Sequence, residues 1–467
     1  MLQRMREALA VLLLTLLPLH AFFVTVGTRL VAGAGQPPLG ALALWKECVL
    51  AVILLLVVVE LFQHASRGVR SFFRLDPLDF CILGLALTAV FVSLRTGWNP
   101  KAIALGVRYD FVPLITFFLV RRVEWSTRFF AQVTKGVLSV GVLVAVYGIL
   151  TLVAPQAFFV WLGYSDLHSL YVSSGPVAAF QQIGALGIRR MQSTMSGPNQ
   201  LGMWLLLPYA LSLIATVRMP QVRTIAGTVI FGGAIALTFS RASWLAAAVI
   251  TVIVFLRATQ PQHRAQRALI GGGVLLCCGI VGMLLFPQVL LRSASTRDHI
   301  LRPLAAVQRM TEQPFGAGLG AAGPAQNRIA DTCVYLDAGA DAAWAQDRPN
   351  LCVFVGDVQV QPPPPTADMP GRVCNCPFLP ESWYLQIGVE LGWVGLALFI
   401  AYTLLLIAAL RNTLPHSDLA YATFLAFMGV SIGALVLHAW EDSAVAYTLA
   451  LLAAAWVNAP RRSSLQL

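Results

Sequence analysis

Long stretches of apolar residues, separated by short polar segments, run along most of the chain. A transmembrane helix needs about 20 predominantly apolar residues. Twelve such stretches are present, centred near residues 16, 51, 86, 113, 145, 208, 231, 249, 277, 399, 428 and 450. The stretch near 113 has the weakest signal because it contains Arg108, Asp110 and Pro113. The pattern predicts an all-α integral membrane protein with about twelve transmembrane helices.

Two polar segments are longer than the rest, one from about 155 to 199 and the other from about 287 to 385. Only the second is long enough to form a small domain. We therefore predict helices 1–9 in residues 1–286, a loop domain in residues 287–385, and helices 10–12 in residues 386–467. No small-residue cleavage site closely follows the first apolar stretch, so we expect that stretch to be retained as the first helix.

The composition supports a membrane protein and gives it an orientation. The chain is 58% hydrophobic and only 11% charged, which excludes an ordinary soluble domain of 467 residues. Short loops on the side of the two termini carry 17 Lys and Arg residues, and those on the other side carry eight. Because basic residues collect in cytoplasmic loops, we expect both termini in the cytoplasm and both long segments outside. The net charge of +11 therefore does not predict a nucleic-acid partner.

Four cysteines lie in the second long segment: Cys333, Cys352, Cys374 and Cys376. Four cysteines in one outward segment predict two disulfides in an oxidising compartment. A bond between Cys374 and Cys376 would be strained, so each of them is expected to pair with Cys333 or Cys352, in either of two patterns. A zinc site is the alternative, but the only histidine of this segment, His299, is far from the cysteines in sequence.

Four arginines on the predicted outer side are not explained by the positive-inside rule: Arg108, Arg189, Arg190 and Arg241. Arginine has a rigid fork of donors that fits phosphate oxygens, and it keeps its charge at neutral pH. Arg190 precedes a polar motif that ends with Asn199 at a predicted helix start, where backbone N–H groups favour an anion. We interpret these arginines as a candidate diphosphate site. The alternative at each position is contact with lipid headgroups.

Two parts of the second long segment carry further candidate chemistry. Residues 296–310 have apolar positions at helical spacing, with Arg302 among them, which predicts an amphipathic helix on the outer surface. Glu381 and Ser382 stand where the chain re-enters the membrane. A carboxylate close to several arginines could act as a general base. The alternative is that both residues cap the next helix.

Four motifs, in their order along the chain, resemble the O-antigen ligase and polymerase superfamily of bacterial inner membranes: RMQSTMSGPNQLGMW, LTFSRASWLA, RMTEQPFGAGLG and ESWYLQIGVELGWVGLALF. The resemblance covers about residues 100 to 410. The positions that match the family pattern are Arg190, Thr194, Pro198, Asn199, Ser240, Arg241, Ser243, Pro314, Gly316, Gly318 and the run from Glu390 to Gly392. The chain departs from many relatives at Glu381, where they carry a histidine.

The resemblance implies a glycosyltransferase whose active site faces the periplasm, in a multi-pass protein of the bacterial inner membrane. The donor would be a glycan on undecaprenyl diphosphate, and the acceptor a sugar hydroxyl of the lipid A core. Transfer would invert the anomeric carbon and need neither a metal nor another cofactor. A polymerase or a protein O-oligosaccharyltransferase of the same superfamily is the alternative, and a transporter is a more distant one.

The same resemblance implies roles for particular side chains. Arg190 and Arg241 would neutralise charge on the leaving diphosphate, an electrostatic role that can replace a metal. The other predicted donor ligands are Arg108, Arg189, Asn199 and Arg302. Glu381 would be the general base. If it is not, the next candidates are His438, Glu441 and Asp442 in the last outer turn.

Overall fold

The computed structural model describes residues 1–66, 75–97, 99–165, 176–178, 180–183, 187–258, 293–336, 339, 341–345, 351–356, 358–361, 373–413 and 417–457. The protein is mostly helical (72%). Seven helical segments in the described ranges are long and apolar enough to cross a membrane. They are Leu2–Ala32, Pro77–Thr96, Pro100–Val120, Thr127–Val153, Pro198–Arg218, Arg241–Ala258 and Trp383–Arg411. They indicate a membrane-embedded protein.

The helices of the first half are α1 (Leu2–Leu16), α2 (His20–Ala32), α3 (Gly40–Ala43), α4 (Trp45–Ser66), α5 (Pro77–Thr96), α6 (Pro100–Gly106), α7 (Val112–Val120), α8 (Thr127–Val153) and α9 (Gln156–Trp161). The others are α10 (Pro198–Arg218), α11 (Val222–Leu237), α12 (Arg241–Ala258), α15 (Ser293–Glu312), α16 (Gly323–Asn327), α17 (Trp383–Arg411), α18 (Asp418–Gly433) and α19 (Ser443–Val457). Helical structure lies at eleven of the twelve predicted centres; the one near residue 277 is outside the described residues.

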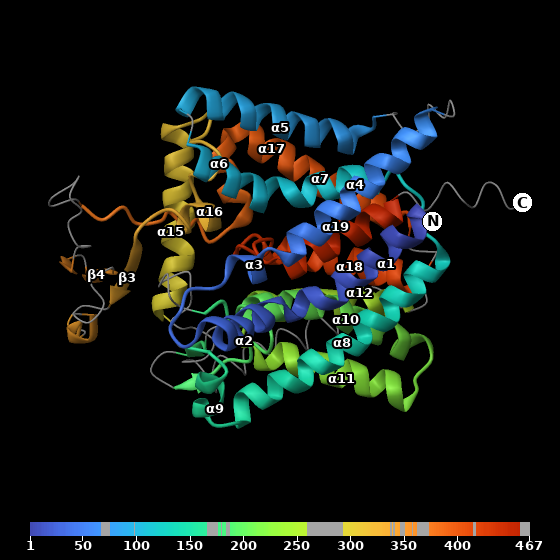
Figure 1. Ribbon diagram of the computed structural model, residues 1–467, viewed down its shortest axis with the longest axis horizontal. Helices are drawn as coiled ribbons and strands as arrows, with labels where there is room; N and C mark the ends of the chain where they lie inside the picture. The colour runs from blue at the N-terminus through green and yellow to red at the C-terminus, as the bar shows by residue number, and fades with distance from the viewer. Residues whose placement is uncertain are drawn as a thin grey trace, which may run out of the picture.

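The start of α1 and the end of α19 lie at the same end of the bundle. Buried Arg6 forms an ion pair with Glu60 at 3.1 Å, and its guanidinium lies 4.1 Å from the centre of the Trp125 ring. From Trp125 a row of packed aromatic rings leads through α8 to Phe130, which stacks on Trp456 at 4.0 Å. Helix α15 and the strands beyond it lie at the opposite end (Figure 1).

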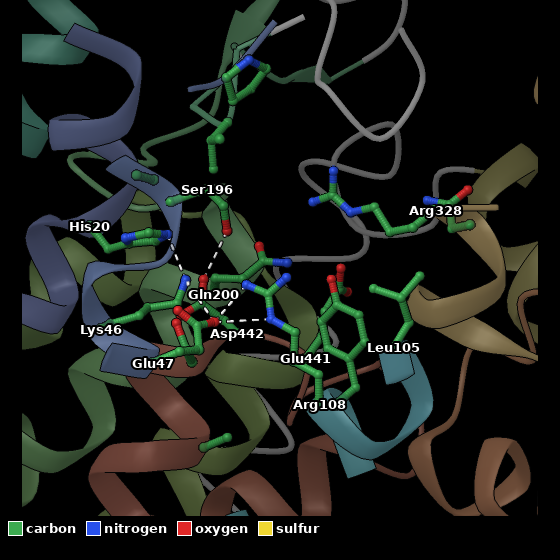
Figure 2. A pocket seen from close by; sticks show the side chains of 18 of the residues that line it. His20, Lys46, Glu47, Leu105, Arg108, Ser196, Gln200, Arg328, Glu441 and Asp442 are labelled. Carbon is green, nitrogen blue, oxygen red and sulfur yellow. Dashed lines mark hydrogen bonds and ion pairs between the residues drawn. The ribbon is translucent and has the colours of Figure 1, made fainter. Parts of the chain in front are cut away.

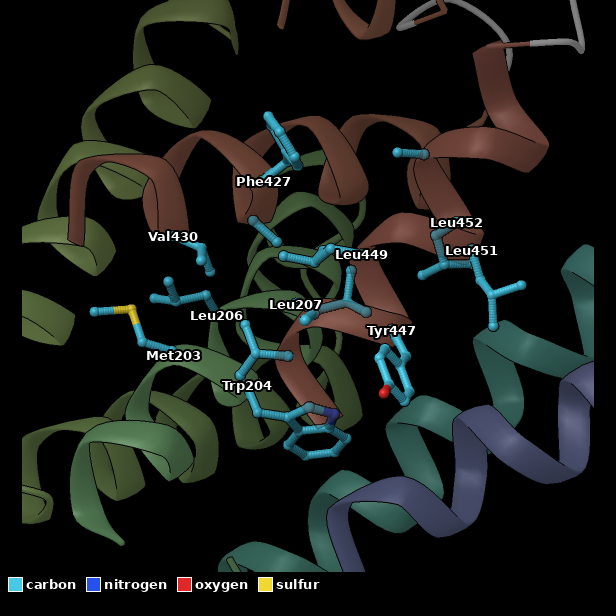
Figure 3. Packing of buried hydrophobic residues seen from close by; sticks show 14 of the residues in the cluster. Met203, Trp204, Leu206, Leu207, Phe427, Val430, Tyr447, Leu449, Leu451 and Leu452 are labelled. Atoms are coloured by element: carbon cyan, nitrogen blue, oxygen red, sulfur yellow. The ribbon is translucent and has the colours of Figure 1, made fainter. Parts of the chain in front are cut away.

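Helix α10 is the centre of the bundle. It packs against α11, α12 and α18, and its most apolar stretch is 78% buried. Figure 3 shows Met203 and Leu206 of α10 beside Val430 of α18, whereas Trp204 and Leu207 of α10 lie toward α19, which carries Tyr447 and Leu449. Proline at the first position of α10 is favourable because that residue's N–H would have no helical partner. The packing of α10 against three neighbouring helices holds the polar segment that precedes it in place.

The third and fourth sequence motifs meet at a break in α17. Gly392 has a φ of 73° in the middle of the helix, a backbone conformation that favours glycine. The glycine-rich turn fits into this break, where the Gly318 N–H donates to the Glu390 carbonyl at 3.2 Å. A methyl group at Gly316 would collide with that same carbonyl, and one at Gly392 would collide with the carbonyl of Pro314. The third and fourth motifs therefore pack against each other through their backbones.

The segment 287–385 is not purely helical. Strands β3 (Thr332–Leu336), β4 (Leu351–Val355) and β5 (Val358–Gln361) form a small sheet, with β3 parallel to β4 and β4 antiparallel to β5. A two-stranded ladder, β1 (Gln182–Ile183) and β2 (Ile188–Arg189), lies in the other long segment. Helix α15 packs against α17. The predicted boundary between residues 286 and 287 lies outside the described residues.

Two disulfides join the sheet to the chain that follows it, as the cysteine count predicted. Cys333 and Cys352 are directly opposite each other on β3 and β4. Cys333 is bonded to Cys376 and Cys352 to Cys374, which is one of the two patterns left open by the sequence. The zinc alternative is excluded because all four sulfur atoms are in disulfides.

Candidate functional site

A charged cavity of about 560 Å³ opens at the end of the bundle that faces α15 (Figure 2). Its walls come from α2, α4, α6, the π-helical turn Val107–Phe111, the segment before α10, and the turn between α18 and α19. The charged or titratable side chains that line it include His20, Lys46, Glu47, Lys101, Arg108, Arg328, Glu441 and Asp442. The mixture of cations and carboxylates suits an anionic, hydroxyl-bearing ligand.

Arg108 is positioned by the π-helical turn, a distortion that is frequent at functional sites. Its Nε and Nη2 atoms donate to one oxygen of Glu47, at 2.9 and 2.6 Å. The Arg108 side chain remains about one-third exposed. This arginine is therefore held by one carboxylate and still presents surface to the cavity.

Arg190 is 9% exposed and braces the segment around it. Its Nε donates to the Thr238 carbonyl at 3.0 Å, and its Nη2 donates to Asn199 Oδ1 at 2.8 Å. Its Nη1 donates at 3.2 Å to Gln181, whose side chain lines the cavity. Arg190 thus joins the start of α10 to the turn before Arg241 and reaches the cavity wall through Gln181.

Arg241 is the first residue of α12 and is partly buried. The serines beside it are fully inside the protein, and Ser243 Oγ donates to Ser240 Oγ at 3.0 Å. Arg189 lies elsewhere: its Nη1 donates to the Thr151 carbonyl at the end of α8 at 2.9 Å. Among the residues that the structure describes, neither Arg189 nor Arg241 lines the charged cavity.

Glu381 belongs to a second cluster next to the cavity. Its Oε1 lies 2.5 Å from Arg302 Nη1, and its Oε2 lies 3.7 Å from His299 Nδ1. Glu381 has a positive φ of 55°, and Ser382 caps α17 by accepting from the Leu385 N–H at 3.5 Å. Ser382 therefore caps α17, and the Glu381 carboxylate is paired with Arg302 and lies close to His299.

The turn between α18 and α19 brings His438, Glu441 and Asp442 to the same region. Burial lowers the pKa of His438 to about 4, although Glu381 opposes that shift, so the imidazole is neutral at physiological pH. Burial also raises the pKa of Glu441 to about 7; the charges of Asp442 and Glu381 act in the same direction, and Arg328 opposes them. Glu441 therefore titrates near neutral pH inside the cavity.

Asp442 has a different environment. Its Oδ2 accepts from Ser196 Oγ at 2.9 Å, and its Oδ1 accepts from the Ala444 N–H at 2.7 Å. Ser196 lies in the polar motif before α10, so this contact joins the first motif to the last outer turn. The two neighbouring carboxyl groups therefore differ in their surroundings. Both oxygens of Asp442 accept hydrogen bonds from the protein, whereas Glu441 faces the open cavity.

The structure brings together only part of the predicted site. Arg108, Glu441 and Asp442 line the cavity, and Arg190 and Asn199 lie directly behind its wall. Arg302 and Glu381 form the adjacent cluster. Sequence reasoning missed Lys46, Glu47, Lys101 and Arg328 as site residues. Their only signal was a charge at the end of a predicted helix or in the long segment. Within the described ranges, no group of three or more metal-ligand side chains is present.

Comparison with known protein families finds no matching family, and comparison with curated proteins finds no matching relative.

Proposed function

We propose that this chain is an O-antigen ligase, which transfers a glycan from undecaprenyl diphosphate to a sugar hydroxyl of the lipid A core. The observation that carries the proposal is the cavity itself. It combines arginines with a carboxyl group that titrates near neutrality, and it lies at the bundle end opposite the start of α1. The four sequence motifs that resemble the superfamily gather around this end or support it.

In this proposal the cations of the cavity hold the diphosphate of the donor. Arg108 and Arg328 face the ligand, and Arg190 and Asn199 fix the start of α10, where helix N–H groups favour an anion. Arg241 supports the same end of the bundle. As the bond from the anomeric carbon to the diphosphate breaks, the electron pair leaves with the diphosphate, and fixed positive charge stabilises it without a metal.

Glu441 is the side chain that best fits the general base. The acceptor hydroxyl attacks the anomeric carbon from the face opposite the diphosphate, which inverts that carbon, and its proton passes to the Glu441 carboxylate. A base is most effective when its pKa is close to the working pH. Glu381, to which the resemblance of the sequence motifs gave this role, raises the pKa of Glu441 from the neighbouring cluster.

The proposal includes a topology: about twelve spans in the bacterial inner membrane, both termini in the cytoplasm, and the cavity open to the periplasm. The common location of the α1 start and the α19 end supports an even number of spans. A periplasm-active reporter inserted after Gly339, in the segment of the small sheet, should be active, and one placed before Met1 should be silent. The reverse pattern would overturn the sidedness.

The surface lipopolysaccharide of a strain that lacks this protein tests the function. Loss of the O-antigen ladder, with accumulation of lipid-linked glycan, is expected for a ligase. A ladder reduced to a single repeat would instead identify a polymerase. An unchanged ladder would reject both functions. Restoration by the wild-type chain, compared with an Arg108→Gln variant of equal abundance, would connect the phenotype to the cavity.

A further inference from the structure

Two side chains of the cavity wall, His20 and Lys46, form a hydrogen-bonded row with Trp45, which does not line the cavity. Trp45 and Lys46 are the first two residues of α4, and His20 is the first residue of α2. The Trp45 Nε1–H donates to His20 Nδ1 at 3.1 Å, and Lys46 Nζ lies 2.6 Å from His20 Nε2. Figure 2 shows Lys46 and His20 side by side at the cavity. Neither the departure of the diphosphate nor the transfer of the acceptor proton to Glu441 uses these three side chains.

The row fixes the position of a proton on the imidazole. An indole nitrogen can only donate a hydrogen bond, so His20 Nδ1 must be the accepting nitrogen and carries no proton. A neutral imidazole then carries its proton on Nε2. His20 therefore donates from Nε2 to Lys46.

A donor at His20 Nε2 requires an acceptor at Lys46 Nζ. The ammonium form of lysine has three donors and no lone pair, and two donors at 2.6 Å would repel each other. The neutral amine has a lone pair and completes the row. The contact is therefore satisfied only if Lys46 is uncharged.

The surroundings are compatible with an uncharged Lys46. Its side chain is only 6% exposed, so an ammonium would lose most of its hydration. The charged groups that face it are Glu47, Asp442, Arg108 and Arg328, two carboxylates and two guanidinium groups. Arg108 itself is bound to Glu47, whose nearest oxygen lies 3.9 Å from Lys46 Nζ. The two carboxylates and the two guanidinium groups largely cancel one another, so they do little to stabilise a positive charge on Lys46.

We propose that Lys46 is a neutral amine in the ligand-free protein and becomes an additional cation of the cavity, by taking up one proton, when a diphosphate ligand binds. The proton comes from solvent and forms a bond with the Lys46 lone pair. The resulting ammonium no longer fits against His20 Nε2–H, so the flexible side chain turns from His20 toward the phosphate oxygens. That the ligand is a diphosphate rests on the proposed function. That Lys46 is uncharged rests only on its hydrogen bonds and surroundings.

The protonation state can be tested directly because the chain has three lysines, Lys46, Lys101 and Lys135. Lys101 lines the same cavity and serves as an internal control. Purified full-length protein is treated with trace acetic anhydride between pH 6 and 10, and mass spectrometry follows acetylation of each lysine. Lys46 should reach half of its maximal rate at or below about pH 7.5, roughly three pH units below the ordinary lysine pKa of about 10.4, because a neutral Lys46 must already be free amine at that pH. A midpoint only about one unit below that of Lys101 would leave Lys46 charged and would reject the neutral amine.

Trp45→Phe distinguishes the hydrogen-bonded row from simple burial. The substitution keeps an aromatic ring but removes the donor that fixes His20, so the imidazole can move its proton to Nδ1 and accept from an ammonium. The Lys46 midpoint should then rise toward that of Lys101, which stays unchanged. Equal midpoints in the wild type, no acetylation of Lys46 at any pH, or no effect of Trp45→Phe would overturn the neutral amine.

Proton uptake tests the role of Lys46 in binding. Farnesyl diphosphate is titrated calorimetrically into the wild type and Lys46→Arg, in buffers with different ionisation heats. Because arginine is already charged, Lys46→Arg should take up about one proton fewer per ligand, and Lys135→Arg, an exposed position of α8 outside the cavity, should behave as the wild type. Equal uptake in Lys46→Arg and wild type would reject the role of Lys46 but leave the diphosphate donor intact. Absence of binding to the wild type would reject the donor as well.

Discussion

Arg302 and Glu381 form an ion pair, with 2.5 Å between Nη1 and Oε1, that fastens helix α15 to the turn before α17. The pair connects a helix of the long outer segment to a span of the bundle. It also lies beside Glu441, whose pKa responds to the charge of Glu381. The electrostatics of the cavity thus depend on a contact made outside its walls.

Opposite substitutions in this pair should shift the pH dependence of transfer in opposite directions. Glu381→Gln removes a negative charge that raises the pKa of Glu441, so the midpoint of the acidic limb should fall. Arg302→Gln leaves the Glu381 charge unbalanced, so the midpoint should rise. Rates of the purified variants from pH 5 to 9 measure both shifts. Complete loss of transfer in Glu381→Gln with donor binding intact would instead make Glu381 the base.

Glu441→Gln should abolish most of the transfer and all of its acidic limb. In the wild type, transfer should rise with pH through a midpoint of about 7, because only the carboxylate form accepts a proton. Loss of a general base typically reduces a rate by about 10²–10⁴-fold. Activity that retains the same acidic limb in Glu441→Gln would exclude this residue.

Stability provides a separate check on Glu441. Its folded pKa of about 7 lies above the ordinary 4.5, so the folded protein binds this proton more tightly than the unfolded chain. The contribution of Glu441 to stability therefore decreases as pH rises from about 4.5 to 7. Glu441→Gln should melt at a higher temperature than the wild type at pH 8, and the difference should shrink at pH 5.

Lysine should not replace Arg190 or Arg241. Arg190→Lys would lose the forked contacts to Asn199 and the Thr238 carbonyl, which should reduce stability by about 1–3 kcal/mol and transfer by at least about tenfold. Arg241→Lys should reduce transfer by a similar factor with a smaller change in stability. Arg218→Lys is the matched control, because Arg218 pairs with Asp418 on an exposed surface. If all three variants transfer the glycan at equal rates, Arg190 and Arg241 serve only as anchors to lipid headgroups.

Both disulfides should be needed for the outer segment to remain folded. Cys333–Cys376 and Cys352–Cys374 close loops with sequence separations of 43 and 22 residues, each contributing about 3–4 kcal/mol in the chain-entropy model. A Cys374→Ser, Cys352→Ser double variant should expose this segment to limited proteolysis while the bundle persists. Non-reducing peptide mapping of the wild type should recover both bonds. Four free thiols would contradict them.

Alanine should be poorly tolerated where the two glycine-containing motifs meet. Gly392→Ala forces a side chain into a positive φ and against the Pro314 carbonyl, so we expect a loss of at least about 2 kcal/mol. Gly233→Ala is the control: the structure shows open space around Gly233 in α11, and alanine there should be neutral or slightly stabilising. Thermal unfolding in detergent compares the two.

Much of the fold was predictable because a membrane span has a local signal. Apolar length alone placed helical structure at eleven of twelve centres, and the cysteine count predicted two disulfides. The bonding pattern depends on the register of β3 against β4, which no local feature encodes. The strands themselves were missed because they have only four or five residues: β4 is a continuous apolar run that periodicity cannot assign, and the alternation of β5 covers only four positions.

The candidate site was less predictable because its members are far apart in the chain. Lys46, Arg328 and Glu441 each carry an unremarkable charge near a helix or a loop, and only tertiary packing places them around one cavity. Arg190 was identified from its polar motif, but its hydrogen bonds show a bracing role that sequence could not distinguish from a direct phosphate contact.

The central place of α10 has a consequence for the order in which the protein is made. Its main partner across the core, α18, begins 200 residues after the end of α10 on the growing chain. Until α18 and α19 emerge from the ribosome, the face of α10 that they cover has only lipid or the insertion machinery as a neighbour. The final packing of the bundle is therefore post-translational, and a nascent chain that stalls before residue 418 should be a preferred substrate for membrane quality control.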